Sequence, residues 1–435
     1  MKYSIKNYIY NPIFLIFILQ LLCCKKINKN FKSFTDDEEI TTITSDNETE
    51  LIEAIKILND NGGTIYIDTP VISLIENSII IITGQFPGGI IGVRQSNGEY
   101  PRIDFSNRMD YISGINIFGA NKFLEYIIIE NSPKIGITIF SDNNILDHVI
   151  SRYNYGSGFH ISGDFNTLNY CYSYRNFGSN DMYLGSSGFL IAGEINNVLN
   201  YCFAWDNAYS GFSYNRILNS SELSYLHSGS WNNGNINVFT GKYDYDNGKP
   251  LDKNLWTIKD IMSTDPNFVS NYYNKKYNID DASIDGYNVN EWIARNSPKL
   301  DGNGFTFGNL NSSQSIDVKK NALYCIAFDH KSVGFVDNYN HKYNGYFTNC
   351  VSFNNGINYK LPFTFSKWIN NWSWGSKNKD QFNQDIITKI PSNSNTAQRS
   401  IYSVRDQIVK AVFANMFPDG INFDNVIINL KEKNN

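Results

Sequence analysis

Short apolar stretches that begin with Gly and an aromatic or aliphatic residue recur along the chain. They start at Gly136, Gly158, Gly188, Gly211, Gly304 and Gly334, and the first three spacings are 22, 30 and 23 residues. Within each unit apolar and polar residues alternate with period two, and Val, Ile, Tyr and Phe prevail, which favours strands. A repeat of about 22 residues is typical of a solenoid turn with three short strands. The pattern therefore predicts an all-β fold, a right-handed parallel β-helix of roughly eight to ten coils.

A second repeated position lies at a bend, where Asn recurs. Asn at such a bend tolerates a left-handed backbone and can bond to the coils above and below. We interpret these residues as a structural ladder: Asn131, Asn154, Asn176, Asn207 and Asn232. Cys171, Cys202, Cys325 and Cys350 precede equivalent strands, and their spacing predicts buried free thiols that fill the core.

The pattern divides the chain into segments. Residues 1–24 are predicted to be a signal peptide or lipoprotein signal, 25–45 a tether, 46–360 the β-helix with an insertion at 241–300, and 361–435 a C-terminal segment. Apolar residues at 51, 54, 55 and 58 predict an N-terminal helix near 49–58 that caps the core. Apolar residues at 401, 404, 408, 409, 412, 413 and 416 predict a C-terminal amphipathic helix that ends at Pro418.

The N-terminus carries features of an export signal. Lys2 and Lys6 precede an apolar run at residues 13–22, which is short for a membrane span. Cys24 follows it in a relaxed lipoprotein box, so both lipidation of Cys24 and simple cleavage stay open. Either outcome predicts a secreted protein or a cell-surface lipoprotein, in contact with a membrane only through a lipid anchor.

The net charge and the aromatic content limit the kinds of molecule that this protein is expected to bind. The net charge of -5 and a pI near 5.6 offer no basic stripe to phosphates, so a nucleic-acid partner is not expected. Aromatic residues make up 15% of the chain; they are common in sugar-binding grooves but also fill β-rich cores. We expect a monomer.

Several segments resemble the pectate lyases of polysaccharide lyase family nine, across roughly residues 46–360. The segments that carry the likeness are residues 185–189, 201–214, 301–308, 325–328 and 334–335. The resemblance implies a calcium site built from Asp side chains and a Lys base that removes the proton α to a uronate carboxylate. The matching calcium positions here are Ser187, Tyr209, Ser210 and Ser213, and the base position is Thr306. Because hydroxyls replace the carboxylates and the amine, we expect neither a calcium cofactor nor the family's β-elimination.

Other candidate residues follow from the alternation of inward and outward side chains along each strand. If Phe159, Phe189, Phe212 and Phe305 point inward, the next residues form an outward column, which is Thr138, His160, Leu190, Ser213, Thr306 and Val336. His160 is its only ionisable member. Arg175, Asp206, Tyr209, Asp329, His330 and Lys331 lie on neighbouring turns. We take His160, Arg175, Asp206, Tyr209 and Lys331 as candidate substrate-binding residues, with solvation of the surface as the alternative role.

The sequence is compatible with three functions. The first is an exported β-helix that binds an acidic polysaccharide with degenerate calcium and base positions. The second is a surface adhesin or structural solenoid without glycan chemistry. The third is an active polysaccharide lyase with an altered site, which would need acidic residues on matching rungs of the groove.

Overall fold

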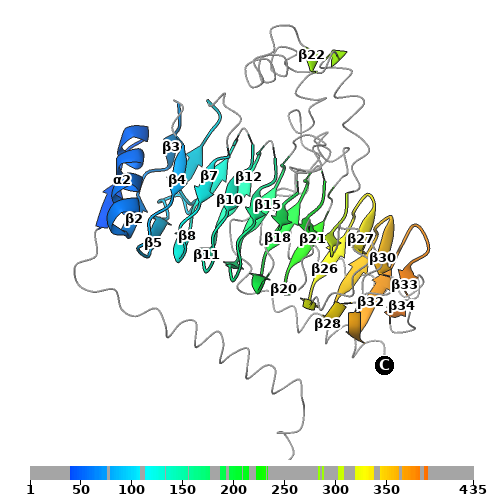
Figure 1. The fold of residues 1–435 in the computed structure, drawn as a ribbon. Coiled ribbons are helices and arrows are strands. Elements are labelled where there is room, and N and C mark those ends of the chain that lie inside the picture. Colours follow the sequence, from blue (N-terminus) through cyan, green and yellow to red (C-terminus); the bar gives the residue numbers. More distant parts are fainter. Residues whose placement is uncertain are drawn as a thin grey trace, which may run out of the picture. The chain divides into compact units, whose positions relative to one another are not determined.

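In the computed structural model the chain winds into a parallel β-helix whose coils stack in one direction (Figure 1). Each coil contributes one strand to each of three sheets, which we name A, B and C. The structure describes residues 40–75, 79–107, 113–132, 134–154, 156–176, 187–192, 195–207, 209–214, 222–231, 233, 283–284, 287–288, 302–307, 319–337, 343–361, 365–382 and 387–389.

The three sheets have these strands in spatial order. Sheet A contains β1 (Ile40–Ile43), β2 (Gly63–Ile67), β5 (Gly88–Gly92), β8 (Lys122–Glu125), β11 (Ile145–Asp147), β14 (Thr167–Asn169), β17 (Asn197–Asn200), β20 (Glu222–Leu226), β25 (Lys319–Leu323), β28 (Tyr343–Thr348) and β31 (Phe365–Ile369). Sheet B contains β3 (Val71–Ser73), β6 (Arg102–Asp104), β9 (Ile128–Glu130), β12 (Ile150–Arg152), β15 (Tyr172–Tyr174), β18 (Phe203–Trp205), β21 (Gly229–Trp231), β26 (Ile326–Phe328), β29 (Val351–Phe353), β32 (Asn371–Trp374) and β34 (Ile387–Lys389). Sheet C contains β4 (Ile80–Ile82), β7 (Ile115–Ile117), β10 (Ile137–Ile139), β13 (Phe159–Ile161), β16 (Phe189–Ile191), β19 (Phe212–Tyr214), β24 (Phe305–Thr306), β27 (Val333–Val336), β30 (Ile357–Leu361) and β33 (Gln381–Phe382). A separate hairpin pairs β22 (Ser283–Ile284) with β23 (Tyr287–Asn288) antiparallel.

In the interior, side chains at equivalent positions stack coil upon coil, and in sheet C several successive ones are Phe. The rings of Phe159, Phe189, Phe212 and Phe305 are nearly parallel, with centroids 4.5–4.9 Å apart. Such stacking adds to the stabilisation from apolar burial. The Gly before each Phe allows the bend to approach sheet B, because a Cβ on Gly158 would lie 1.9 Å from Ser173 Oγ. The Gly-Phe repeat therefore marks entry into sheet C.

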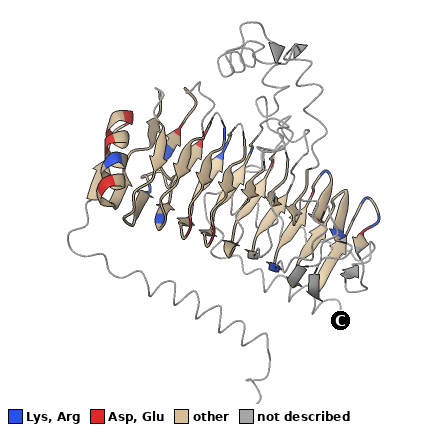
Figure 2. Cartoon of the chain, in the orientation of Figure 1, with Lys and Arg blue, Asp and Glu red and all other residues tan. Residues whose placement is uncertain are grey.

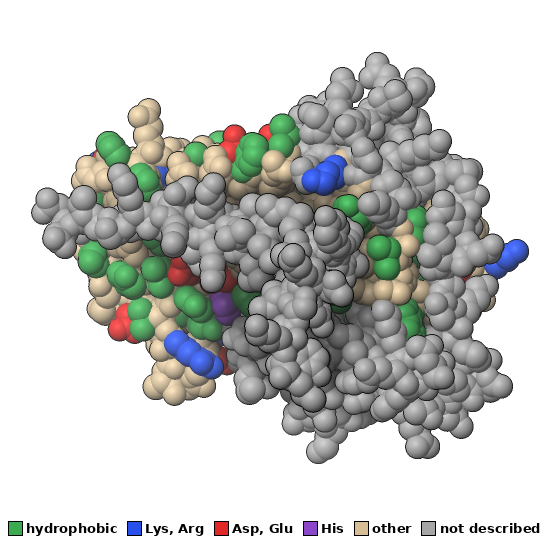
Figure 3. All heavy atoms as spheres, turned by 90° about the horizontal axis from the view of Figure 1, so that it is seen from below, with side chains coloured by type: hydrophobic (Ala, Val, Ile, Leu, Met, Phe, Trp, Pro, Cys, Tyr) green, Lys and Arg blue, Asp and Glu red, His purple; other side chains and the backbone are tan. Residues whose placement is uncertain are grey.

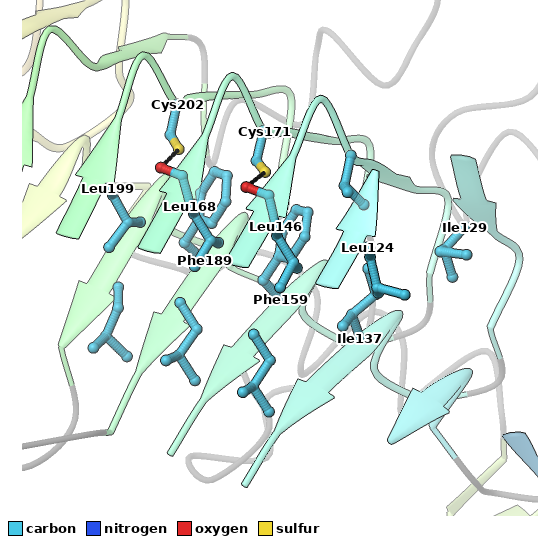
Figure 4. Close-up of a cluster of buried hydrophobic side chains, with 14 of the residues drawn as sticks. Leu124, Ile129, Ile137, Leu146, Phe159, Leu168, Cys171, Phe189, Leu199 and Cys202 are labelled. Carbon is cyan, nitrogen blue, oxygen red and sulfur yellow. Dashed lines mark hydrogen bonds between the residues drawn. The ribbon is translucent and has the colours of Figure 1, made fainter. Parts of the chain in front are cut away.

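Four of the six cysteines of the chain lie at the interior edge of sheet B. Cys171, Cys202, Cys325 and Cys350 are buried free thiols, as the spacing predicts. Cys171 Sγ donates to the carbonyl of Leu146 at 3.5 Å and Cys202 Sγ to that of Leu168 at 3.4 Å (Figure 4). Each thiol thus fills space and satisfies a strand carbonyl.

An asparagine ladder runs along the bend between sheets B and C. Each backbone N–H donates to the side chain of the equivalent residue one coil on, at 2.8–3.2 Å. The members are Ser132, Asn154, Asn176, Asn207, Asn233, His330 and Asn355. Two of the predicted members were wrong by one residue: Ser132 takes the place assigned to Asn131, and Asn233 the place assigned to Asn232. Asn131 instead holds the left-handed bend just before the ladder, with φ 60°.

A second ladder lies at the bend into sheet A. The backbone N–H groups of Lys122, Asn144 and Asn166 donate to Asn144, Asn166 and Asn197 Oδ1 at 2.8–3.0 Å. Asn144, Asn166 and Asn197 recur at separations of 22 and 31 residues, and this recurrence reflects a repeated hydrogen bond between coils.

Helix α2 (Glu48–Asn61) lies at one end of the stack, over the segment for which the sequence predicts a helix (Figure 1). Asn47 caps it by accepting from the Glu50 N–H at 3.2 Å. Leu51, Ala54, Ile55 and Leu58 join the core. This amphipathic face covers the apolar interior of the first coils.

The strands continue past residue 360, where the sequence analysis ended the β-helix. β31 to β34 extend all three sheets as far as Lys389. The predicted signal segment with Cys24, most of the tether, the C-terminal helix and nearly all of the insertion at 241–300 lie outside the described residues. Among the described residues, no helix has the length and apolar character needed to cross a membrane.

His330, the histidine of the asparagine ladder, is expected to make the stability of the protein depend on pH. Burial lowers the pKa of His330 to about 3, whereas an unfolded His has a pKa of about 6.5. The unfolded chain therefore binds this proton first, and stability falls as the pH drops from about 6.5 towards 3. At 1.36 kcal/mol per pKa unit, the loss by pH 4 is about 3 kcal/mol.

We expect His330→Asn to remove this loss while leaving stability near neutral pH almost unchanged. Asn can accept from the Asn233 N–H as His330 Nδ1 does at 3.2 Å, and Asn is the residue on the neighbouring rungs. Urea unfolding at pH 7 and pH 4.5 measures the difference. Equal acid sensitivity in both proteins would show that His330 is not the titrating group.

Candidate functional site

The outer face of sheet C carries the column expected from the alternation. Register pairs Thr138 with His160, His160 with Leu190, Leu190 with Ser213, and Thr306 with Val336. The flanking Phe and Ile residues are in the core, so this column faces outward. All of its members except His160 are nevertheless at most 5% exposed. The face is therefore a buried surface, which the alternation alone does not predict.

Unpartnered hydroxyls gather along this column and the bend that leads into it. Thr138 Oγ1, Ser187 Oγ, Ser210 Oγ and Thr306 Oγ1 are buried without a hydrogen-bond partner among the described residues. Ser187 and Ser210 occupy equivalent positions on successive coils, because Gly188 N–H donates to the Ser210 carbonyl at 2.9 Å. A buried hydroxyl that forms no hydrogen bond is costly, by about 1–3 kcal/mol. This group of hydroxyls is our candidate site.

The residues at the calcium positions do not fit calcium. Ser187, Ser210 and Ser213 offer neutral hydroxyls, whereas calcium takes six to eight oxygen ligands and owes its affinity to carboxylates. Among the described residues no three His, Cys, Asp or Glu side chains come together as a metal site. Tyr209, the fourth position, is half-buried beside Ser210.

His160 lies at the partly exposed point of the column. Its Nε2 is 3.0 Å from Ser162 Oγ, and its ring meets Phe140 edge-on with centroids 6.3 Å apart. Burial, and to a lesser degree the charge of Lys134, lower its pKa to about 4. Such a weak base is poorly suited to abstracting a carbon-bound proton near neutral pH.

A lysine does lie close to the base position, although on the core side. Lys320 Nζ donates to the carbonyl of Phe307, the residue after Thr306. It also lies 3.5 Å from the ring centroid of Tyr214, and Tyr214 and Phe307 are core residues. Burial holds the pKa of Lys320 well below its usual value. Because Lys320 is fully buried among core side chains, it does not replace the base on the outer face.

The remaining candidates lie on other bends. Arg175 and Asp206 follow β15 and β18 of sheet B and pair with each other, Nε to Oδ2, at 3.7 Å. Asp206 is 1% exposed, so its carboxylate faces Arg175 and not solvent. Lys331 follows β26 and is exposed. The structure therefore places Arg175 and Asp206 together and away from His160 on sheet C.

A charged cluster on sheet B was missed by the sequence analysis. Arg152 lies 2.7 Å from Glu130 Oε2 and donates to Tyr174 Oη at 2.8 Å. The three residues are 22 apart and share one register position. Their equal spacing in the sequence was the available signal.

The comparisons with known proteins agree with this architecture. A family model described as "Pel9A-like, right handed beta helix region" matches residues 33–249. The structure of pectate lyase Pel9A is 16% identical, with a TM-score of 0.53, and the match covers 81% of this chain and 79% of that one. A rhamnogalacturonan lyase structure is also 16% identical, with a TM-score of 0.51 and coverage of 82% and 87%. No curated protein matches the chain. The likeness to the two structures is one of fold.

Proposed function

We propose that this chain, a pectate lyase-like protein with a Pel9A-like right-handed β-helix region, binds an acidic polysaccharide without calcium-dependent cleavage. The observation that carries the proposal is the set of unpartnered hydroxyls at Thr138, Ser187, Ser210 and Thr306. Buried polar groups normally find a partner. A glycan that displaces the cover of this buried face would supply one for each of them through its hydroxyl and carboxylate oxygens.

Basic residues beside the column favour an acidic ligand. Lys134 precedes β10, Lys331 precedes β27, and Lys360 pairs with Val336 at the end of the column. Figure 2 shows basic residues at bends of the last coils and acidic ones mainly on α2 and the coils nearest to it. This asymmetry supports binding of a uronate-containing chain towards the C-terminal coils.

Binding to polygalacturonate tests the proposal. We expect Lys331→Glu combined with Lys360→Glu to weaken binding about tenfold, at roughly 0.7 kcal/mol for each exposed ion pair. Lys56→Glu, on the exposed face of α2, is the matched control and should bind as the unaltered protein does. Titration calorimetry with and without EDTA gives both affinity and metal dependence. Absence of binding to acidic and neutral glycans alike would favour the structural solenoid.

Export is part of the same proposal and rests on the apolar run at 13–22 and on Cys24. We expect the mature protein to begin at or near Cys24, as a secreted or lipid-anchored monomer. Mass spectrometry of the native N-terminus measures this directly. An intact Met1 would contradict export by this signal.

A further inference from the structure

Two exposed phenylalanine rings lie side by side near the N-terminal end of sheet C. Phe118 directly follows β7 and Phe140 directly follows β10, and the pairing of Ile117 with Ile139 makes them equivalent residues on neighbouring coils. Their rings are stacked, with centroids 4.6 Å apart and planes 9° apart. The two side chains are nevertheless 49% and 45% exposed. Hydrophobic side chains of described residues also reach the surface in the view from below (Figure 3). We call Phe118 and Phe140 the phenylalanine platform.

The phenylalanine platform lies on the same face as the candidate site. The N–H of Phe140 donates to the Ile117 carbonyl at 2.8 Å, so the ladder of sheet C continues through this residue. Ile139 points into the core, and alternation therefore turns Phe140 outward, as it does Thr138. The ring of Phe140 also meets that of His160 edge-on. The platform is thus continuous with the column that contains Thr138 and His160.

Packing between coils does not require aromatic residues at this position. The equivalent residue is Thr83 on the preceding coil, and Ser162 and Ala192 on the two coils that follow. The N–H groups of Ser162 and Ala192 make the same ladder hydrogen bond, at 2.7 Å. Single exposed hydrophobic residues are normal on a protein surface. Two stacked rings where small residues suffice indicate a surface that binds something.

One ring face of the platform is open. Thr83 is exposed and carries no ring, so within the described chain nothing aromatic stacks on the face of Phe118 opposite Phe140. The face of an aromatic ring is electronegative and attracts polarised C–H groups. A pyranose ring presents several C–H groups on one face and its hydroxyls around the edge. The open face of Phe118 therefore suits a sugar ring.

The size of the platform argues against a protein partner. Half of two phenylalanine side chains, each of about 200 Å², leaves roughly 200 Å² exposed. A stable protein interface buries about 800 Å² on each partner. The exposed area is instead on the scale of one or two sugar rings.

Polar groups border the platform, as the hydroxyls of a sugar require. His160 Nε2 and Ser162 Oγ lie 3.0 Å apart next to Phe140. Thr138 Oγ1 is buried without a hydrogen-bond partner among the described residues. A few polar groups beside an apolar surface are typical of ligand sites, where they fix the orientation of the ligand. Because the platform itself is exposed, a sugar can bind there before the cover of Thr138 is displaced.

The charges beside the platform favour a neutral sugar. Asp142 lies two residues after Phe140 and is exposed, so a uronate carboxylate would meet a like charge there. Lys134 precedes β10 and therefore lies at the opposite end of that strand. Lys331 and Lys360 lie beside β27 and in β30, and the five strand steps from β10 to β27 span about 24 Å. The two ends of the column thus favour different sugars.

We propose that the phenylalanine platform is a subsite for a neutral pyranose residue, which stacks on the open face of Phe118. This inference rests on the glycan binding proposed above and narrows it. The ligand is then a heteropolysaccharide, with neutral residues over the N-terminal coils and uronate residues over the C-terminal coils.

Matched double substitutions in the full chain test the subsite. Phe118→Ala with Phe140→Ala removes the platform, whereas Phe86→Ala with Phe165→Ala removes two rings that are equally exposed but lie elsewhere in the bends. The probes are linear oligosaccharides of galactose, of glucose and of mannose, together with oligogalacturonate, and titration calorimetry measures their affinities. We expect at least one neutral probe to bind, and to bind about tenfold more weakly without the platform. The control variant should bind it unchanged.

The acidic probe separates this inference from the proposed function. Loss of the platform should leave oligogalacturonate binding unchanged, whereas Lys331→Glu with Lys360→Glu should weaken it and spare the neutral probe. If oligogalacturonate alone fails to bind, the acidic ligand is contradicted while the neutral subsite is supported.

Three outcomes would overturn the subsite. The first is that no neutral probe binds the unaltered protein, and the second is that both double variants weaken binding equally. The third is a dimer, seen by light scattering, that only the platform variant loses, because the rings would then contact a second copy. Circular dichroism checks the fold of each variant. If the alanine variant does not fold, Phe118→Leu with Phe140→Leu removes the rings but keeps apolar volume, and the same outcomes apply.

Discussion

Replacing Asn207 by Ala is expected to lower the free energy of unfolding by about 3–5 kcal/mol, from two or more lost buried hydrogen bonds at about 1–3 kcal/mol each. Asn207 Oδ1 accepts from Asn176 N at 3.2 Å and from Asn176 Nδ2 at 2.8 Å, and its own Nδ2 donates to the Ser173 carbonyl at 3.1 Å. Alanine would leave the Asn176 backbone N–H and one of the two Nδ2 hydrogens buried and unpaired, while Nδ2 keeps its bond to Ser173 Oγ at 3.0 Å. Urea unfolding followed by circular dichroism measures the loss.

Asn143 provides the control for this prediction. It is exposed and sits at a left-handed bend with φ 59°. Asn143→Ala costs only the strain of that backbone conformation, about 1–2 kcal/mol. A loss for Asn207→Ala of only about 1–2 kcal/mol, no larger than for Asn143→Ala, would mean that the ladder hydrogen bonds add little to stability.

The sequence alone predicts the interior of sheet C accurately. The Gly-Phe repeat identifies Phe159, Phe189, Phe212 and Phe305 as inward and fixes the outward column beside them. The prediction succeeds because successive side chains of a strand alternate between two faces, and the Gly marks where the bend approaches sheet B. After Gly334 the Gly-Phe signal is lost, and the coils beyond residue 360 were accordingly missed.

The bends are harder to predict because adjacent positions favour the same residue. Asn suits both the left-handed bend and the ladder position after it, so Asn131 could not be distinguished from a ladder residue by type. His330 fills a ladder position through a ring nitrogen that accepts a backbone N–H. Tyr and His hold left-handed bends after sheet A, with φ of 47–56°, where residue preference predicts Gly or Asn. Stacking on neighbouring coils stabilises rings there.

The candidate site shows a different limit of sequence reasoning. Alternation correctly placed Thr306 and Ser213 on the outer face, but it carries no information on what covers that face. The pairing of Arg175 with Asp206 was also unseen, because insertions change the spacing between coils from 22 to 31 residues. The residues that touch between successive coils are set by the pairing register of their strands. That register can be assigned only when the positions of the inserted residues in each coil are known.

Restoring carboxylates at the four matched positions is expected to create calcium dependence that the unaltered protein lacks. In the variant Ser187→Asp, Tyr209→Asp, Ser210→Asp and Ser213→Asp, several charges are brought to one buried face, where their repulsion and desolvation oppose folding. Calcium offsets both effects, and a ligand at 100 times its Kd adds about 2.7 kcal/mol of stability. Thermal unfolding with calcium or EDTA should therefore differ by several degrees in the variant and not in the unaltered protein.

The same variant separates metal binding from catalysis. With Thr306 in place it should bind calcium without cleaving polygalacturonate, because a hydroxyl is not a base near neutral pH. Thr306→Lys alone should also be inactive, since the metal that acidifies the α-proton is missing. Only the five substitutions together bring metal and base to one face, and ultraviolet absorbance of the unsaturated product measures the result. Calcium-stimulated cleavage by the unaltered protein would refute this account, because its hydroxyls would then support the reaction that we expect them to have lost.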